Sequence, residues 1–205
     1  MTRFCIGEIM ESIIEQSCPI CFADKGLKLF VHISEIPYFG EHTQMTMLCE
    51  ECGWKNTDFI PAEGKKPGAW SIIISNISHM STRVVRSSSC TIKIDEIGLE
   101  VEPGGNSSGY ISNIEGVLNR FKGIVEMILR QAKRDKDDNI EKCLILLDKI
   151  NEIKNGNKEV EMILLDPMGH SQILHEDAKS RDLDETEIAE LPTGPSIPVF
   201  DLNED

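Results

Sequence analysis

Two Cys-x-x-Cys pairs near the start of the chain constrain its fold more than any other feature. The pairs, which 27 residues separate, are Cys18/Cys21 and Cys49/Cys52. Each pair can place two sulfurs on one side of a metal ion, so together they can supply the four ligands of a tetrahedral site. The intervening residues are enough for two strands that run out and back, which the alternating pattern predicts over 27–33 and 43–48. This is the layout of a zinc ribbon.

We expect these four cysteines to bind one zinc ion per chain. Iron in a rubredoxin-like site would use the same ligands, and the sequence leaves that alternative open. A thioredoxin-like redox motif would instead carry a single pair at the start of a helix that follows a strand. Because protein ligands fill all four positions, no place is left for a substrate or a water molecule. The metal is therefore expected to be structural and not catalytic.

The other cysteines do not form a disulfide framework. The chain has seven cysteines, and Cys5, Cys90 and Cys143 are isolated in the sequence. The N-terminal residues mix acids with apolar side chains and lack the positive start and cleavage site of a signal peptide. No apolar run approaches the length of about 18–20 residues that a membrane span needs. We expect a cytoplasmic protein, in which thiols stay reduced.

The charge of the chain argues against a nucleic-acid partner. Lysine and arginine total 21 against 35 acids, a net charge of −14. Between Cys18 and Trp54 there are two bases and five acids, whereas a protein that binds phosphate backbones needs the opposite balance. A group of basic residues between Arg120 and Lys136 is interpreted as a solvated helix face. A protein partner is therefore favoured, with no membrane and no small-molecule substrate.

The rest of the chain divides into a β domain and an acidic tail. Residues 1–62 are assigned to the N-terminal segment and the ribbon, 63–177 to the β domain, and 178–205 to the tail. Segments rich in β-branched residues predict long strands over 69–78 and 83–94. From Glu176 onward ten acids stand against two bases. Such a composition predicts a partly disordered tail.

A helical hairpin is predicted over residues 112–156, inside the β domain. Ser112 and Glu115 have the spacing of a capping box at its start, and Asn155–Gly156 should end its second helix. The first helix carries apolar residues at helical spacing, which indicates one buried stripe. They are Ile114, Val117, Leu118, Phe121, Ile124, Val125, Ile128 and Leu129.

Four motifs in this order resemble those of the ZPR-type zinc-finger family. They span about residues 17–175, and His170 stands where the family usually has asparagine. The motifs are the Ile36–Phe39 run (Ile-Pro-Tyr-Phe), the second pair with its sequel (Cys49, Cys52, Gly53, Trp54, Lys55, Asn56), the Asn113–Leu118 segment (Asn-Ile-Glu-Gly-Val-Leu) and the Asp166–Ser171 turn (Asp-Pro-Met-Gly-His-Ser).

This resemblance implies a mainly β fold with an α insertion. The zinc ribbon would precede a double-stranded β-helix-like, or jelly-roll-like, domain that carries an antiparallel helical hairpin. Eukaryotic members contain this module twice, and the single copy here is similar to the archaeal form. Eukaryotic members of the family bind translation elongation factor 1-alpha and assist its folding, so the resemblance implies a binding or folding factor for this GTPase. The alternative is a zinc-ribbon regulator that binds another protein or RNA in transcription or translation.

The candidate partner-binding residues are aromatic side chains close to the zinc pairs. Tyr38, Phe39 and Trp54 belong to a module too small to bury all of them, and tyrosine and tryptophan are enriched at binding hot spots. They could instead attach the ribbon to the β domain, and for Phe39 we favour that role.

We expect no enzyme and assign no catalytic residue. Asp166 and His170 share one turn, but turn geometry is enough to explain that segment. We also expect no metal-dependent oxygenase site of the kind that a double-stranded β-helix can carry. His79 has no group near it in sequence that would orient it, and the histidines are assigned to packing or to the surface.

Overall fold

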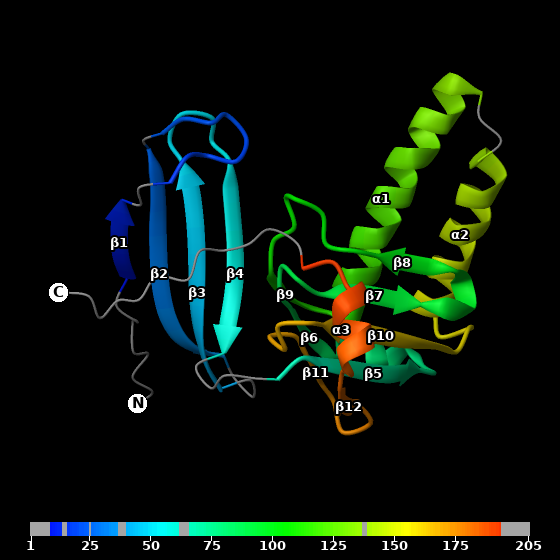
Figure 1. Ribbon diagram of the computed structural model, residues 1–205. Coiled ribbons are helices and arrows are strands. Elements are labelled where there is room, and N and C mark those ends of the chain that lie inside the picture. The colour runs from blue at the N-terminus through cyan, green and yellow to red at the C-terminus, as the bar shows by residue number, and fades with distance from the viewer. Residues whose placement is uncertain are drawn as a thin grey trace, which may run out of the picture.

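The computed structural model describes residues 9–13, 16–24, 26–36, 40–61, 66–136 and 139–193, which form a small N-terminal module beside a larger β domain (Figure 1). The small module is an antiparallel sheet in the order β1-β2-β3-β4. The strands predicted over 27–33 and 43–48 lie within β2 and β3, while β1 and β4 extend the sheet on either side. The strands are β1 (Ile9–Ile13), β2 (Leu27–Ile36), β3 (Gly40–Cys49) and β4 (Lys55–Pro61).

The β domain consists of two sheets with a core between them and the helices. One sheet has the order β12-β5-β10-β7-β8 and the other the order β11-β6-β9. Apolar residues of both sheets and of two helices share a single buried cluster. The strands are β5 (Gly68–Ile74), β6 (Arg83–Arg86), β7 (Thr91–Ile94), β8 (Leu99–Val101), β9 (Tyr110–Asn113), β10 (Val160–Asp166), β11 (Gln172–Leu174) and β12 (Lys179–Asp182).

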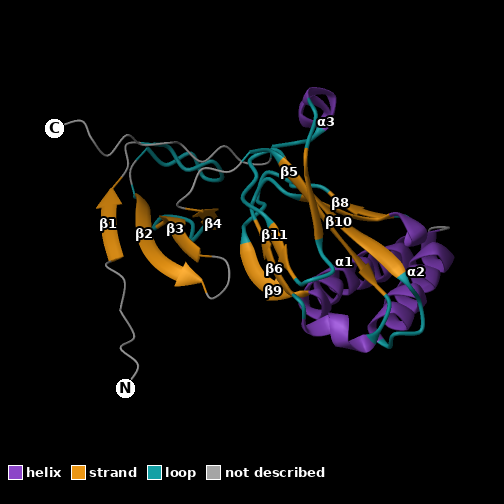
Figure 2. Ribbon diagram, turned by 90° about the horizontal axis from the view of Figure 1, so that it is seen from below, coloured by secondary structure: helices purple, strands orange, loops and turns teal. Residues whose placement is uncertain are grey.

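The predicted helical hairpin is present as α1 (Ile114–Asp135) and α2 (Asn139–Lys154). Its helices lie on the side of the β domain away from the ribbon, as both views show (Figures 1 and 2). The predicted Ser112 cap is wrong, because it is the side chain of Asn113 that accepts the hydrogen bond from the Gly116 amide, at 2.8 Å. Most of the apolar stripe is buried, but Ile124 and Ile128 are exposed.

The long strand predicted over 83–94 is interrupted by a buried turn at residues 87–90, between β6 and β7. The side chains of its three serines donate hydrogen bonds alternately to two different carboxylates. Ser87 and Ser89 donate their hydroxyls to the carboxylate of Asp166, at 2.8 and 2.7 Å, while Ser88 donates its hydroxyl to Asp58 at 2.6 Å. Both carboxylates are buried. The prediction was wrong because a serine run can belong to a strand or to a turn, and these distant carboxylates select the turn.

The same turn joins the two modules. Asp58 lies on β4 of the ribbon and also accepts the main-chain N–H of Ser88 at 2.9 Å. The amide of Gly109 donates to the carbonyl of Thr57 at 2.7 Å, in the loop that precedes β9. A Cβ at position 109 would come within 2.6 Å of Oδ1 of Asp58, so only glycine fits here. The ribbon is thus fixed to the β domain through main-chain and buried polar contacts.

The sheet extends into the segment predicted as a tail. β12 pairs with β5, and Leu183 is buried and donates its amide to the carbonyl of Pro67 at 3.1 Å. The short helix α3 (Glu185–Glu190) follows, with a capping box between Asp184 and Glu187. The expected boundary at residue 178 therefore falls inside the β domain, because backbone pairing to an open sheet edge does not require apolar composition. Residues 194–205 lie outside the described part of the chain.

Removal of the Phe121 ring should destabilise the β domain. This side chain is 3% exposed and belongs to the core shared by helices and sheets. Phe121→Ala should lower the free energy of unfolding by about 3–5 kcal/mol, since it leaves a cavity as well as losing apolar burial. Denaturant titration measures the change. A loss near zero would contradict the packing of α1 on the sheets.

Asp58→Asn should flatten the pH dependence of stability. Burial raises the pKa of the Asp58 carboxyl, although hydrogen bonds from Ser88 and Phe59 oppose the shift. A folded-state pKa above the unfolded one gives stability at low pH that is lost as the pH rises through the folded value. An asparagine side chain can still form hydrogen bonds with Ser88 but does not ionise. As the pH rises, the variant should therefore lose less stability than the unaltered protein does. Denaturant titrations at several pH values, within the pH range in which the metal stays bound, measure the free energy of unfolding. An equal dependence of this free energy on pH in the variant and the unaltered protein would contradict the prediction.

Candidate metal centre

The two Cys-x-x-Cys pairs fold into turns with matching backbone hydrogen bonds. In the first, the amide of Phe22 donates to the carbonyl of Cys18 at 2.9 Å; in the second, Gly53 donates to Cys49 at the same distance. The residue after each pair has a left-handed backbone, with φ of 58° at Phe22 and 74° at Gly53. Glycine adopts this conformation without cost, whereas phenylalanine rarely does. We call these two turns, residues 18–23 and 49–54, the knuckles.

The four sulfurs converge at the distances that a zinc ion needs. All four lie within 4.8 Å of one another. The Cys18–Cys52 and Cys21–Cys49 sulfur pairs, one sulfur from each knuckle, are both 3.7 Å apart. A tetrahedron with zinc–sulfur bonds of about 2.3 Å has sulfur–sulfur edges of about 3.8 Å, while a disulfide would need about 2.05 Å. The donor set and its spacing fit tetrahedral zinc.

The electrostatics of the site favour a bound cation. Burial raises the pKa of the Cys18 thiol, but main-chain hydrogen bonds from Cys21 and Ile20, together with side-chain hydrogen bonds to the neighbouring cysteines, lower the pKa to about 7. A hydrogen bond from the main chain of Ala23 lowers the pKa of Cys21, yet desolvation and the neighbouring sulfurs raise it to about 12. Several thiolates this close repel one another, and a divalent cation removes that repulsion.

The metal site is also the centre of the ribbon's small core. Cys18 and Cys49 are each 1% exposed and pack with apolar residues of β2 and β3. Cys21 and Cys52 are exposed. The apolar residues in contact with this cluster are Leu27, Leu29, Val31, Met45, Met47 and Trp54. A core of this size cannot stabilise a sheet by itself, so the metal would supply much of the folding free energy.

Comparison with protein families accounts for both modules. A model described as the ZPR1 zinc-finger domain matches residues 8–67, and one described as the ZPR1 jelly-roll domain matches residues 78–191. The chain belongs to the ZPR1 family. This confirms the predicted fold class, a zinc ribbon followed by a jelly-roll domain with a helical hairpin. It also makes the four-cysteine centre the zinc site of a ZPR1 zinc finger.

ZPR1-like proteins of archaea match nearly the whole chain. An uncharacterized ZPR1-like protein of Methanocaldococcus jannaschii is 36% identical over 94% of this chain and 96% of its own length. Another, from Pyrococcus horikoshii, is 38% identical over 95% of this chain and 90% of its own. The human zinc finger protein ZPR1 is 26% identical, and the match covers 82% of this chain but only 37% of the human one. The chain is thus a single-module member, as the archaeal relatives are.

Of the residues predicted to bind a partner, the described part of the chain includes Trp54 alone. Its ring is half-buried against the ribbon core, and its Nε1–H donates to Oδ1 of Asn106 at 3.2 Å. Trp54 therefore connects a knuckle to the loop before β9. Tyr38 and Phe39 lie outside the described residues. Phe22, which is 76% exposed, was not among the residues predicted from the sequence. The sequence signal that could have identified it is its position directly after the first pair, where the second pair has Gly53.

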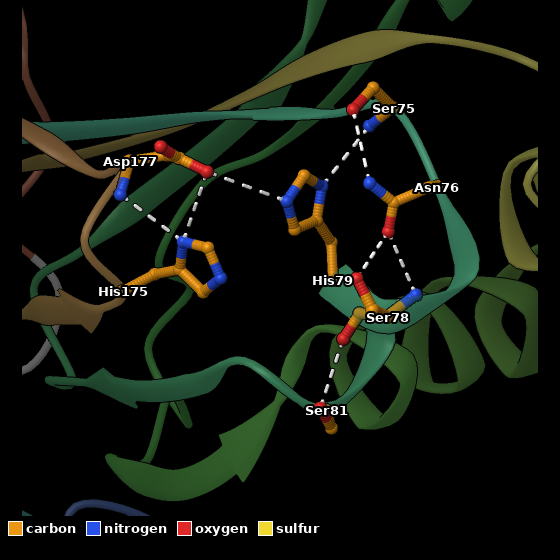
Figure 3. A network of polar contacts seen from close by, with 7 residues as sticks. All are labelled: Ser75, Asn76, Ser78, His79, Ser81, His175 and Asp177. Carbon is orange, nitrogen blue, oxygen red and sulfur yellow. Dashed lines mark hydrogen bonds and ion pairs between the residues drawn. The ribbon is translucent and has the colours of Figure 1, made fainter.

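A second cluster of possible metal ligands lies in the β domain (Figure 3). His79 comes from the turn Ile77–Ser81, and His175 and Asp177 come from the loop between β11 and β12. Oδ2 of Asp177 is 3.8 Å from Nε2 of His79 and 3.5 Å from Nδ1 of His175. The sequence analysis assigned these histidines to packing or to the surface, but residues 175–177 have the His-x-Asp spacing of a facial triad, and folding adds His79 as a second histidine.

The hydrogen bonds of this cluster do not suit a metal ion. Nδ1 of His79 accepts the main-chain N–H of Ser75 at 3.2 Å, and Nδ1 of His175 accepts that of Asp177 at the same distance. A neutral imidazole whose Nδ1 accepts a hydrogen bond carries its proton on Nε2. A histidine that ligates through Nε2 instead donates from Nδ1. The cluster is therefore a polar contact that holds the loop after β11 against residues 75–79.

The purified protein should contain one zinc per chain, and the ribbon should depend on it. Cys49→Ser should release the metal and unfold the ribbon, because a structural zinc supplies about 10–16 kcal/mol of apparent binding free energy. The β domain has its own core and should stay folded. Elemental analysis measures zinc, and circular dichroism or NMR follows the two modules.

The second histidine cluster provides the control. His175→Ala should leave the zinc content at one per chain. Two metal ions per chain in the unaltered protein, with one lost in this variant, would contradict the hydrogen-bond argument. Absence of any bound metal in pure protein would contradict the assignment of the knuckles.

Proposed function

We propose that this protein is a cytoplasmic binding or folding factor for the translation GTPase elongation factor 1-alpha, and that it is not an enzyme. The zinc centre holds the knuckles in a fixed shape, and the knuckles present apolar side chains to the partner. The elongation-factor partner comes from the family resemblance. Among the relatives, one from Schizosaccharomyces pombe is named zinc finger chaperone zpr1, and it is 26% identical over 78% of this chain. That name supports a protein partner.

The observation that carries the proposal is the side chain of Phe22. It is 76% exposed and sits at a left-handed backbone position that costs a non-glycine residue about 1–2 kcal/mol. Ile20, in the same knuckle, is 47% exposed. Neither the fold nor solubility gains from a phenylalanine here, and Gly53 shows that glycine serves at the equivalent point. Backbone strain and exposed apolar area at one place are features of a binding site.

The features of the site agree with a binder. The four protein thiolates fill the coordination sphere of a tetrahedral metal, which leaves no position for a reacting group. The ribbon carries an excess of acids over bases between Cys18 and Trp54, which disfavours phosphate backbones. Among the described residues no helix is long and apolar enough to cross a bilayer.

Phe22→Gly should separate stability from binding. The variant removes the strained conformation, so it should keep its zinc and unfold with an unchanged free energy or one raised by up to about 1 kcal/mol. It should bind elongation factor 1-alpha at least about tenfold more weakly, a loss of about 1.4 kcal/mol. Calorimetry of the purified pair, with GDP and with a GTP analogue, measures the affinity. Ile33→Ala is a matched control, since Ile33 is 45% exposed on β2, outside the knuckles.

Trp54→Phe tests the predicted role of the second knuckle. It keeps a ring against the ribbon core but removes the bond to Asn106. Weaker binding in a well-folded variant would support a contact with the partner, and unchanged binding would restrict Trp54 to the joint. If the unaltered protein binds the factor in neither nucleotide state, that partner is wrong. A pull-down from native cytosol, with and without RNase, would then identify the regulator's protein or RNA target.

A further inference from the structure

A cavity beside the base of α1 has features that the fold does not explain. It has a volume of about 400 Å³ and lies between α1, β8 and β9. That volume is in the range of about 300–1,000 Å³ typical of ligand sites. Its walls are mainly apolar, with two arginines among them. Its lining includes Arg86, Tyr110, Arg120, Gly123, Ile124 and Met127.

The two arginines carry positive charge that no carboxylate neutralises directly. Arg86 is 6% exposed, and its guanidinium donates to the carbonyls of Cys90 and Ser108 and to the hydroxyl of Ser107. Its Cζ lies 5.6 Å from the centre of the Tyr110 ring, and that of Arg120 lies 4.3 Å from the same centre. In the described part of the chain neither arginine forms an ion pair with an acid. The cavity is therefore an electropositive place in an acidic protein.

Gly123 provides a second, independent observation. It lies in the middle of α1, where glycine costs about 1 kcal/mol relative to alanine. At the other glycine of this helix, Gly116, a Cβ would come too close to Oγ of Ser112, so the Ser112 side chain would have to shift. A Cβ at position 123 would meet no atom within 4 Å. The fold thus does not need this glycine, and its missing side chain leaves an open notch in the cavity wall.

The apolar surface continues beyond the cavity. Ile124 and Met127 at its edge are 42% and 56% exposed, and Ile128 on the next turn of α1 is 46% exposed. A small molecule held in the cavity would leave these side chains in water. A peptide chain that crosses the notch could cover them while one of its side chains fills the cavity. The extent of the patch favours a polypeptide over a metabolite.

We infer that this cavity docks a peptide segment of a partner protein that has an aromatic or aliphatic side chain beside a carboxylate. The apolar walls accept the side chain, the notch at Gly123 admits the peptide backbone, and Arg120 pairs with the carboxylate. The buried guanidinium of Arg86 adds positive potential from the inner wall of the cavity. This inference rests on the proposed function in one respect, that the protein is a binder of proteins.

The first experiment uses defined peptides and the full-length protein. The probe is acetyl-Phe-Asp-Leu-amide, and the control probe is acetyl-Phe-Asn-Leu-amide, which lacks only the charge. Two-dimensional NMR should show amide shifts at residues 120–127 with the first peptide. The second should bind at least about threefold more weakly, because it cannot pair with Arg120. Absence of shifts at several millimolar peptide would overturn the inference.

Variants of α1 then locate the contact. Gly123→Leu should close the notch and abolish the shifts while the helix keeps or gains stability, since leucine is a better helix former. Gln131→Leu adds the same side chain to an exposed position of α1 outside the cavity and should leave binding unchanged. Arg120→Gln should remove the difference between the two peptides, and Arg120→Lys should restore part of it. Equal binding by Gly123→Leu and the unaltered protein would overturn the site.

Two further outcomes would assign the cavity to a different occupant and so overturn the inference. One is a change at the Gly123 amide when Asp201→Asn is made in peptide-free protein, which would point to the chain's own acidic end. The other is a shift that depends on protein concentration, which would point to a second copy.

Calorimetry with elongation factor 1-alpha tests the proposed function separately from the cavity. Peptide binding without factor binding would refute the proposed partner alone, and factor binding unaffected by Gly123→Leu, with no peptide binding, would refute the cavity alone.

Discussion

The arrangement of the two modules depends on the buried turn at residues 87–90. Its serines donate to two carboxylates, Asp166 of β10 and Asp58 of β4, which approach from opposite modules. A buried carboxylate is costly unless several donors satisfy it, and here each one has them. Asp166 also accepts the hydroxyl of Ser171 at 2.6 Å, which gives the Asp166–Ser171 turn a structural role. The zinc ribbon is therefore held at a fixed place on the β domain.

Because the ribbon has a fixed place on the β domain, the zinc centre can influence the structure beyond the ribbon itself. Metal binding organises the knuckles, the knuckles order the ribbon, and β4 transmits that order to the joint with the β domain. The exposed Phe22 then lies on an ordered support, so the proposed binding to a partner would not include the cost of ordering this segment. The cavity beside Gly123 is lined by α1, whose apolar side packs in the core of the β domain. In the proposed function, the contact residues would therefore be preorganised on both modules.

The local patterns were sufficient where one short segment determines the outcome. The metal ligands follow from the Cys-x-x-Cys spacing, and the hairpin follows from an apolar stripe with helical period. The serine run was misassigned because its turn depends on Asp58 and Asp166, which are 30 and 77–79 residues away in sequence. The β12 strand was missed for a similar reason, since only its pairing with β5 reveals it. The cap of α1 moved by one residue because serine and asparagine both suit that position.

The four metal ligands, the ribbon, the hairpin and the family resemblance could all be predicted from the sequence, because each depends on residues that are neighbours in the chain or nearly so. How these parts are joined, and which side chains they expose, follows from contacts between segments that are distant in sequence. The tertiary structure brought His79 to His175 and Asp177 and showed, from the hydrogen bonds at Nδ1, that these histidines are not arranged as metal ligands. It also distinguished Gly116, which lies close to the Ser112 side chain, from Gly123, which has open space beside it. The burial of a side chain, the strain of a backbone position and the orientation of a histidine Nδ1 lone pair all depend on atoms from distant segments. A local sequence pattern therefore does not predict them.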